Sequence, residues 1–186
     1  MADAVAVAEY LLYLAENEIE AEPITPLRLQ KLLYYVQGWS WGYTAQPMFA
    51  DSLKAWPHGP VVVRVYERYK GAEASPLRAS GKRAWSSLTV RERELIEGVW
   101  EAHKQYSASA LREKTHREPP WMEARRGLPS DSKRATSISN EVMKAFFFRQ
   151  RQLLKNDPVH AERAARIEEA RWQVARGGFV NIDDIR

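Results

Sequence analysis

Apolar residues recur at every third or fourth position over the first part of the chain, which is the spacing of an amphipathic helix. Residues 3–17 carry one such stripe, and residues 26–43 carry a second, wider one. Thr25 followed by Pro26 supplies a helix N-cap and a proline at the first helical position. The pattern therefore predicts two helices, and the wide apolar face of the second predicts that it forms the spine of the core.

The helical spacing stops at Ala45, where prolines and polar residues become frequent. Residues 52–56 alternate between apolar and polar side chains, which predicts a short strand. Gly59 and Pro60 then carry the glycine-proline signal of a helix start, so we expect a helix from there through Tyr69. A loop or a small hairpin is expected before the next helix.

Capping signals mark the helices of the second half. Thr89, with Glu92 three positions later, forms a capping box for a helix that runs to about Lys104. Further helices are expected from Ser107 to about Arg117, in a short turn from Trp121 to Gly127, from Ser139 past Leu153, and from Asn156 to Gly177. In the last of these, charged residues surround only a few apolar ones.

These elements predict a mainly α-helical fold. We expect a compact bundle of about six to seven helices with a short β-strand or hairpin insertion. The simplest organisation is a helical domain over residues 1–155 and a charged C-terminal helical arm over residues 156–186.

Composition narrows the class of protein. The chain has no cysteine, which excludes disulfides, thiolate catalysis and cysteine-ligated metals and favours an intracellular protein. The first 14 residues lack the basic charge of a signal peptide, and no apolar run approaches the roughly 20 residues that span a bilayer. We therefore expect a cytoplasmic protein with no membrane segment.

The charge balance gives only weak support for nucleic-acid binding. The chain has 28 Lys and Arg against 24 Asp and Glu, a net charge of +4, although basic residues outnumber acidic ones over residues 64–134. A DNA-binding transcriptional regulator that uses this basic middle stays open as an alternative. Pro119 and Pro120 interrupt the segment where a recognition helix would have to continue, so nucleic acid is an unlikely partner.

No catalytic or metal-binding pattern is present. The four histidines lack the spacing that places two ligands on one metal, and no phosphate-binding glycine motif or nucleophile elbow occurs. His58, between Pro57 and Gly59, is the one histidine in a constrained position. We expect no enzyme activity, no metal and no cofactor. Seven Trp and eight Tyr instead suit a module that binds another protein.

One part of the sequence resembles a known family. The run LQKLLY at residues 29–34, followed by AW at 55–56 and GPV at 59–61, resembles the Panacea domain, and a looser similarity extends over about residues 5–150. The motif residues that carry the resemblance are Leu29, Gln30, Leu32, Gly59, Pro60, Val61 and Trp121. His58 departs from the family pattern, which often has tyrosine there, and the arm after Asn156 lies beyond the similar part.

The resemblance implies an antitoxin of a bacterial or prophage toxin-antitoxin system. Such a domain neutralises a cognate protein toxin, encoded by an adjacent gene, through direct protein-protein binding. Some relatives act instead as adaptors that deliver the toxin to an ATP-dependent protease, so this alternative stays open. The oligomeric state and the identity of the toxin do not follow from the sequence.

The resemblance and the aromatic residues together suggest a partner-binding site. Lys31 and Tyr35 are expected to be partly exposed next to the turn that carries Trp56 and His58, and to form a patch with them. The competing interpretation, internal packing with Lys31 donating to a carbonyl oxygen, is slightly favoured. Trp172 on the arm either packs back on the domain or anchors the partner.

The remaining motif residues are expected to be structural. Gly59 and Pro60 should set the turn and the N-terminus of the next helix, and Trp121 should plug the core.

Overall fold

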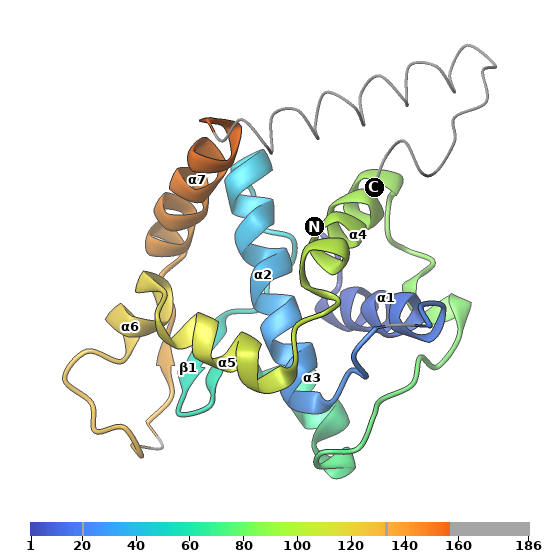
Figure 1. The fold of residues 1–186 in the computed structure, drawn as a ribbon, viewed down its shortest axis with the longest axis horizontal. Helices are drawn as coiled ribbons and strands as arrows, with labels where there is room; N and C mark the ends of the chain where they lie inside the picture. The colour runs from blue at the N-terminus through green and yellow to red at the C-terminus, as the bar shows by residue number, and fades with distance from the viewer. Residues whose placement is uncertain (20, 133, 157–186) are drawn as a thin grey trace.

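The computed structural model describes residues 1–19, 21–132 and 134–156, and within these ranges the protein is mainly helical (Figure 1). The helices are α1 (Ala4–Glu16), α2 (Pro26–Thr44), α3 (Val63–Tyr69), α4 (Val90–His103), α5 (Ala108–His116), α6 (Pro119–Ala124) and α7 (Asn140–Asn156), with short 3-10 turns η1 (Lys70–Ala72) and η2 (Lys82–Trp85). The strands are β1 (Leu53–Trp56), β2 (Gly59–Val62) and β3 (Thr136–Ser137). The predicted helical fold with a small β insertion is confirmed.

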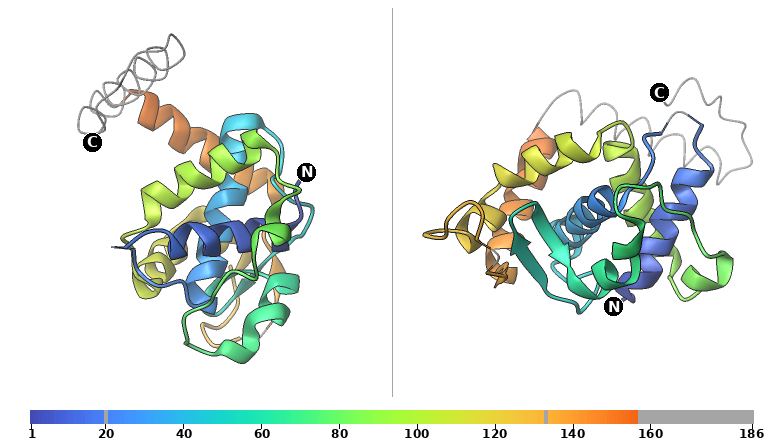
Figure 2. Two further views of the ribbon diagram at one scale, coloured as in Figure 1. Left: turned by 90° about the vertical axis from the view of Figure 1, so that its right-hand side faces the viewer. Right: turned by 90° about the horizontal axis from the view of Figure 1, so that it is seen from below.

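Helix α2 runs through the middle of the molecule, with the other helices and the β-hairpin arranged around it (Figures 1 and 2). The Thr25 hydroxyl accepts a hydrogen bond from the Arg28 N–H, and Pro26 occupies the first turn, as the capping signal predicts. The helix ends at Ala45, which has a φ of 56° and donates its N–H to the carbonyl of Trp41.

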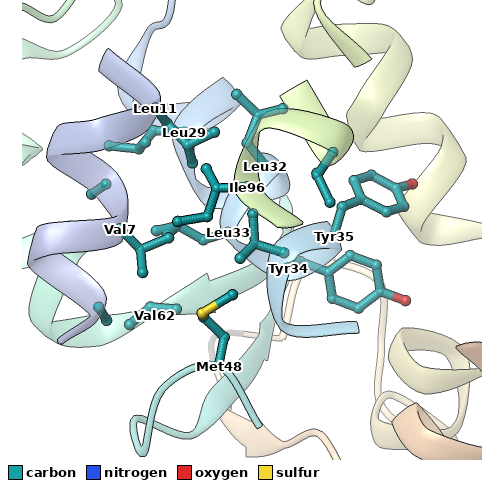
Figure 3. Close-up of a cluster of buried hydrophobic side chains, with 14 of the residues drawn as sticks. Val7, Leu11, Leu29, Leu32, Leu33, Tyr34, Tyr35, Met48, Val62 and Ile96 are labelled. Atoms are coloured by element: carbon teal, nitrogen blue, oxygen red, sulfur yellow. The ribbon is translucent and has the colours of Figure 1, made fainter. Parts of the chain in front are cut away.

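The apolar core forms on the leucines of α2 (Figure 3). Leu29, Leu32 and Leu33 are fully buried and lie in one cluster with Val7 of α1 and Ile96 of α4. Each buried leucine stabilises the fold by about 1.5–3 kcal/mol relative to an exposed one. The prediction that α2 is the spine of the core is confirmed.

The β-hairpin differs from the prediction at Gly59 and Pro60. Strand β1 pairs antiparallel with β2, and Trp56 lies opposite Gly59, so Pro57 and His58 make the turn. The helix expected from Pro60 begins only at Val63. The hairpin is possible because β2 is an edge strand of the β2-β1-β3 sheet, where a proline without an N–H is tolerated.

The capping signals of the second half are confirmed. Thr89 and Glu92 form both hydrogen bonds of the capping box of α4. The Ser107 hydroxyl accepts from the Ala110 N–H at the start of α5, and the Ser139 hydroxyl accepts from the Val142 N–H at the start of α7. The helix expected from Asn156, and with it the arm over residues 156–186, lies outside the described residues except for Asn156 itself.

Helix α7 packs closely on α2 because two glycines of α2 face it. A Cβ atom added to Gly38 would lie 2.1 Å from Cε2 of Phe147, and one added to Gly42 would lie 3.0 Å from the carbonyl oxygen of Phe147. The Phe147 ring fills this space and meets the ring of Trp39 edge to face. The two helices therefore approach more closely than side chains at positions 38 and 42 would allow.

Candidate functional site

The polar residues of the LQKLLY motif hold the hairpin against α2. The Gln30 Oε1 accepts a hydrogen bond of 2.7 Å from the Val62 N–H, and the Lys31 Nζ donates one of 2.9 Å to the carbonyl of Pro60. Lys31 is 0% exposed, so the expectation that it is partly exposed is wrong. The alternative, in which Lys31 bonds to a carbonyl inside the protein, is confirmed.

Gly59 is required both by its backbone and by the space around it. Its φ of +104° is a conformation that side-chain-bearing residues rarely adopt. A Cβ atom there would also lie 2.6 Å from Cε and 2.7 Å from Nζ of Lys31, and 3.2 Å from the hydroxyl of Thr115. The hairpin turn therefore lies directly over the end of the Lys31 side chain, beside α5.

Burial changes the chemistry of Lys31. The pKa of the ammonium group is lowered to about 7, mainly because burial disfavours the charged form and also because Arg112 is positively charged. The carbonyl of Pro60 partly compensates by accepting a hydrogen bond. Near neutral pH Lys31 is therefore only partly protonated beneath the hairpin.

Tyr35 is also buried and connects α2 to the start of α6. Its side chain is 1% exposed, and its hydroxyl donates a hydrogen bond of 3.0 Å to Glu118. The ring stacks on His103 with centroids 4.3 Å apart. Burial raises the pKa of Glu118 above its usual value. The expectation of a partly exposed Tyr35 is wrong, because α4, α5 and Glu118 cover this side of α2.

His58 lies at the surface in the hairpin turn, and Trp56 comes just before the turn at the end of β1. His58 is exposed, and Trp56 is half-buried with its ring edge-on to Tyr66 at 4.7 Å. The carbonyl of Trp56 accepts a hydrogen bond of 3.0 Å from the Trp121 Nε1. The turn is thus fastened to α6, and Trp121 is only partly buried rather than a core plug.

The C-terminal end of α5 completes this surface. The His116 ring stacks on Trp121 with centroids 4.0 Å apart and planes 10° apart. Arg112 precedes His116 by one helical turn and therefore lies on the same face of α5. We call Trp56, His58, Arg112, His116 and Trp121 together the hairpin-turn surface.

Basic groups surround His116 on the hairpin-turn surface. The pKa of His116 is lowered to about 4, first by burial and then by the charges of Arg112, Lys31, His58 and Arg125. The four charged groups that act most strongly on this imidazole are all basic. Such a surface attracts negatively charged groups.

Arg125 fixes the loop beside the hairpin rather than facing a partner. Its guanidinium donates to the carbonyls of Pro129, Ser130 and Ser132 at 2.8–3.0 Å, and more distantly to that of Ala55. The residue is buried, so its hydrogen-bonding capacity is used inside the protein.

A family model described as "antitoxin SocA-like, Panacea domain" matches residues 29–122, which is just over half of the chain. The chain belongs to this family of Panacea-domain antitoxins. No curated protein and no solved structure matches the chain.

The matched part of this Panacea domain starts in α2 and ends in α6. It contains both hydrogen bonds from α2 to β2, the whole hairpin and all five residues of the hairpin-turn surface. Helices α1 and α7 lie outside it, so the match is narrower than the resemblance over about residues 5–150 that the sequence suggested. The motif residues Leu29, Leu32 and Val61 are buried, in keeping with a structural role.

Sequence reasoning missed Arg112 and His116. The spacing of four between them was visible, but a helix of charged and polar residues offered no reason to select these two. Their contact with the hairpin depends on how α5 packs against β2, which connects residues more than 50 positions apart. The predicted site residue Trp172 lies outside the described residues.

Two further features of the described residues concern metal ions and membranes. Across the part of the chain that the structure describes, no group of three or more His, Asp or Glu side chains is placed to hold a metal ion. In the same residues, no helix is both long and apolar enough to cross a membrane.

Proposed function

We propose that this protein neutralises a protein toxin, encoded by an adjacent gene, by binding it directly. The observation that supports the proposal most strongly is the family match, because it covers every residue of the hairpin-turn surface. Membership of an antitoxin family implies a toxin as partner in general terms. The direct contact and the genetic position of the toxin are our inference.

The composition of the hairpin-turn surface supports a role in protein binding. Partly buried tryptophans next to an arginine are the residue types that contribute most to protein interfaces. Trp56 packs against Tyr66, and Trp121 is held by the carbonyl of Trp56 and by the ring of His116, so these two side chains lose little freedom when a partner binds. Lys31 and Tyr35 are buried below this surface and support it indirectly, by holding the hairpin and α5 in place. Trp172 remains a proposed second contact.

Co-expression tests this proposal. The adjacent gene would be induced in a bacterial host with and without the full-length antitoxin, while growth is followed and the tagged toxin is pulled down. We expect growth to be restored and the two proteins to be recovered together. His58→Asp should weaken both effects, whereas Glu94→Ala on the exposed face of α4 should leave them unchanged.

The amount of toxin in the same cells separates masking from degradation. Under direct neutralisation, the toxin accumulates at a normal or higher level while growth is restored. A toxin level that falls only in strains with an active ATP-dependent protease would favour the adaptor alternative. Failure to restore growth together with failure to form a complex would contradict the proposed function.

A further inference from the structure

Several basic side chains gather where the hairpin turn meets α5. Arg112 and His116 lie one turn apart on α5, Lys31 ends beneath Gly59, and His58 is at the tip of the turn. Each of the other three groups acts electrostatically on His116, and Arg112 also acts on Lys31. Burial favours the neutral forms of His116 and Lys31, whereas the guanidinium group of Arg112 keeps its positive charge.

Among the described residues, nothing neutralises Arg112. Its guanidinium takes part in no salt bridge and no hydrogen bond there, and its Nε is buried without a partner. The Nε2 of His116 is likewise buried and unpaired. Groups of this kind normally find a partner when they are buried, so two unpaired ones on the same face of one helix call for an explanation.

Other arginines of the protein show what satisfied guanidinium groups look like. Arg64 forms salt bridges with Asp3 and Asp51, and Arg125 donates to several carbonyl oxygens. Arg117, on the same helix as Arg112, pairs with Glu113. Arg112 differs from these, because its guanidinium group has no such partner among the described residues.

We propose that Arg112, flanked by His116 and His58, binds the carboxylate of an acidic side chain on the toxin. This inference rests on the proposed function. A guanidinium group matches a carboxylate with two parallel hydrogen bonds, and His116, one helical turn from Arg112, stacks on Trp121. An Arg beside aromatic rings is a typical centre of a protein interface.

The start of α6 beside this place offers no backbone donors for a phosphate group. Phosphate sites commonly use the free N–H groups at the start of a helix. Helix α6 begins with Pro119 and Pro120, neither of which has an N–H to donate. The donors at the site are therefore side chains, which suits a single acidic residue presented by a protein partner.

The affinity of the purified, full-length antitoxin for the protein of the adjacent gene tests the inference. We expect Arg112→Glu to weaken binding by about tenfold or more, because one charge of the pair is then reversed. Arg112→Gln should weaken it less. Arg91→Glu, a matched charge reversal on the exposed part of α4, should change the affinity less than about twofold.

Thermal unfolding of the same variants separates binding from folding. Removing a cation from a basic cluster relieves repulsion, so both Arg112 variants should melt at or above the temperature of the wild type. A lower melting temperature with an affinity loss of the same size in Arg112→Gln and Arg112→Glu would show a structural role and overturn the inference.

The remaining outcomes are distinguishable. If the wild type binds and neutralises the toxin but Arg112→Glu does so equally well, the inference fails and the proposed function stands. Equal losses in Arg112→Glu and Arg91→Glu would show only general electrostatic attraction and would also overturn it. If the wild type binds no toxin, and instead binds a DNA duplex with an affinity that falls steeply with salt, both proposals fail.

Discussion

Helix α2 is joined to the hairpin region and to α7 by different means. Polar side chains join it to residues 48–62, through Gln30, Lys31 and Gln37. Glycines join it to α7, where Gly38 and Gly42 leave room for Phe147. The first contact is directional, because each hydrogen bond satisfies a particular buried backbone group. The second depends mainly on shape, since the hydrogen bond from Arg151 to the carbonyl of Gly42 is long, at 3.4 Å.

The difference shows which contact positions the candidate site. The hydrogen bonds to β2 fall wholly within the family match and fix the hairpin on which Trp56 and His58 lie. Helix α7 falls outside the match. Weakening the polar contact should therefore affect both stability and toxin binding, whereas weakening the glycine contact should affect chiefly stability.

The largest change in the free energy of unfolding is expected from Gln37→Leu. The Gln37 Oε1 accepts from the N–H groups of Met48 and Phe49, and its Nε2 donates to the carbonyl of Phe49. Leucine leaves these three buried groups unpaired, so the free energy of unfolding should fall by about 3 kcal/mol or more. Urea denaturation measures the change. Gln105→Leu, at an exposed position, should stay within about 0.5 kcal/mol of the wild type.

The next effect is expected from Gly38→Ala, which should lower the free energy of unfolding by about 1–3 kcal/mol because the new methyl group displaces Phe147. Gly98 provides a matched control, since it also lies in a helix but has no atom within 4 Å of an added Cβ. Gly98→Ala should stabilise the protein by about 0.5–1 kcal/mol. Equal effects of the two changes in denaturation experiments would contradict close α2–α7 packing.

A pH dependence tests the burial of Lys31. Its pKa is lowered from 10.5 to about 7 in the folded protein, so between these pH values the unfolded chain binds a proton that the folded protein has lost. Stability should therefore rise with pH in this window, by about 1 kcal/mol between pH 7 and pH 8. Lys31→Met should remove this rise. An identical pH profile in wild type and variant would show that Lys31 reaches water.

The smallest effect is expected from Gly42→Ala. An added Cβ would lie 3.0 Å from the Phe147 carbonyl oxygen, a mild overlap that a shift of a few tenths of an ångström relieves. The helix-favouring effect of alanine offsets part of this strain, so stability should change by less than about 1 kcal/mol. If Gly42→Ala lowers the free energy of unfolding more than Gly38→Ala does in the same urea series, α7 approaches α2 most closely at Gly42, which contradicts the structure.

The helices were predictable because their signals are local. The capping box of Thr89 and Glu92, the Thr25-Pro26 start of α2 and the serine caps of α5 and α7 lie within a few residues of the helices they begin. Gly59 and Pro60 were misread because the same residue pair suits a helix start and a tight turn into an edge strand. The strand β2 is favoured by hydrogen bonds to Gln30 and Lys31, which lie about 30 residues earlier in the chain.

The candidate site was predicted only in part for the same reason. The strand that ends at Trp56 and the constrained position of His58 were predicted from local signals. The structure has Trp56 half-buried at the end of β1 and His58 exposed in the turn. Lys31 and Tyr35 were expected at the surface because helix side chains that end in a polar group usually face water. Their burial depends on β2 and Glu118, which reach α2 from distant parts of the chain.

The most direct test of the central claim is a photo-crosslinking experiment in cells. A photoreactive amino acid would replace His58 at the hairpin turn or, as a control, Glu94 on the exposed face of α4, with the adjacent gene co-expressed. We predict a crosslink to the toxin from position 58 and none from position 94. Neutralisation of the toxin with a crosslink from position 94 alone, or with none from position 58, would contradict recognition by the hairpin-turn surface.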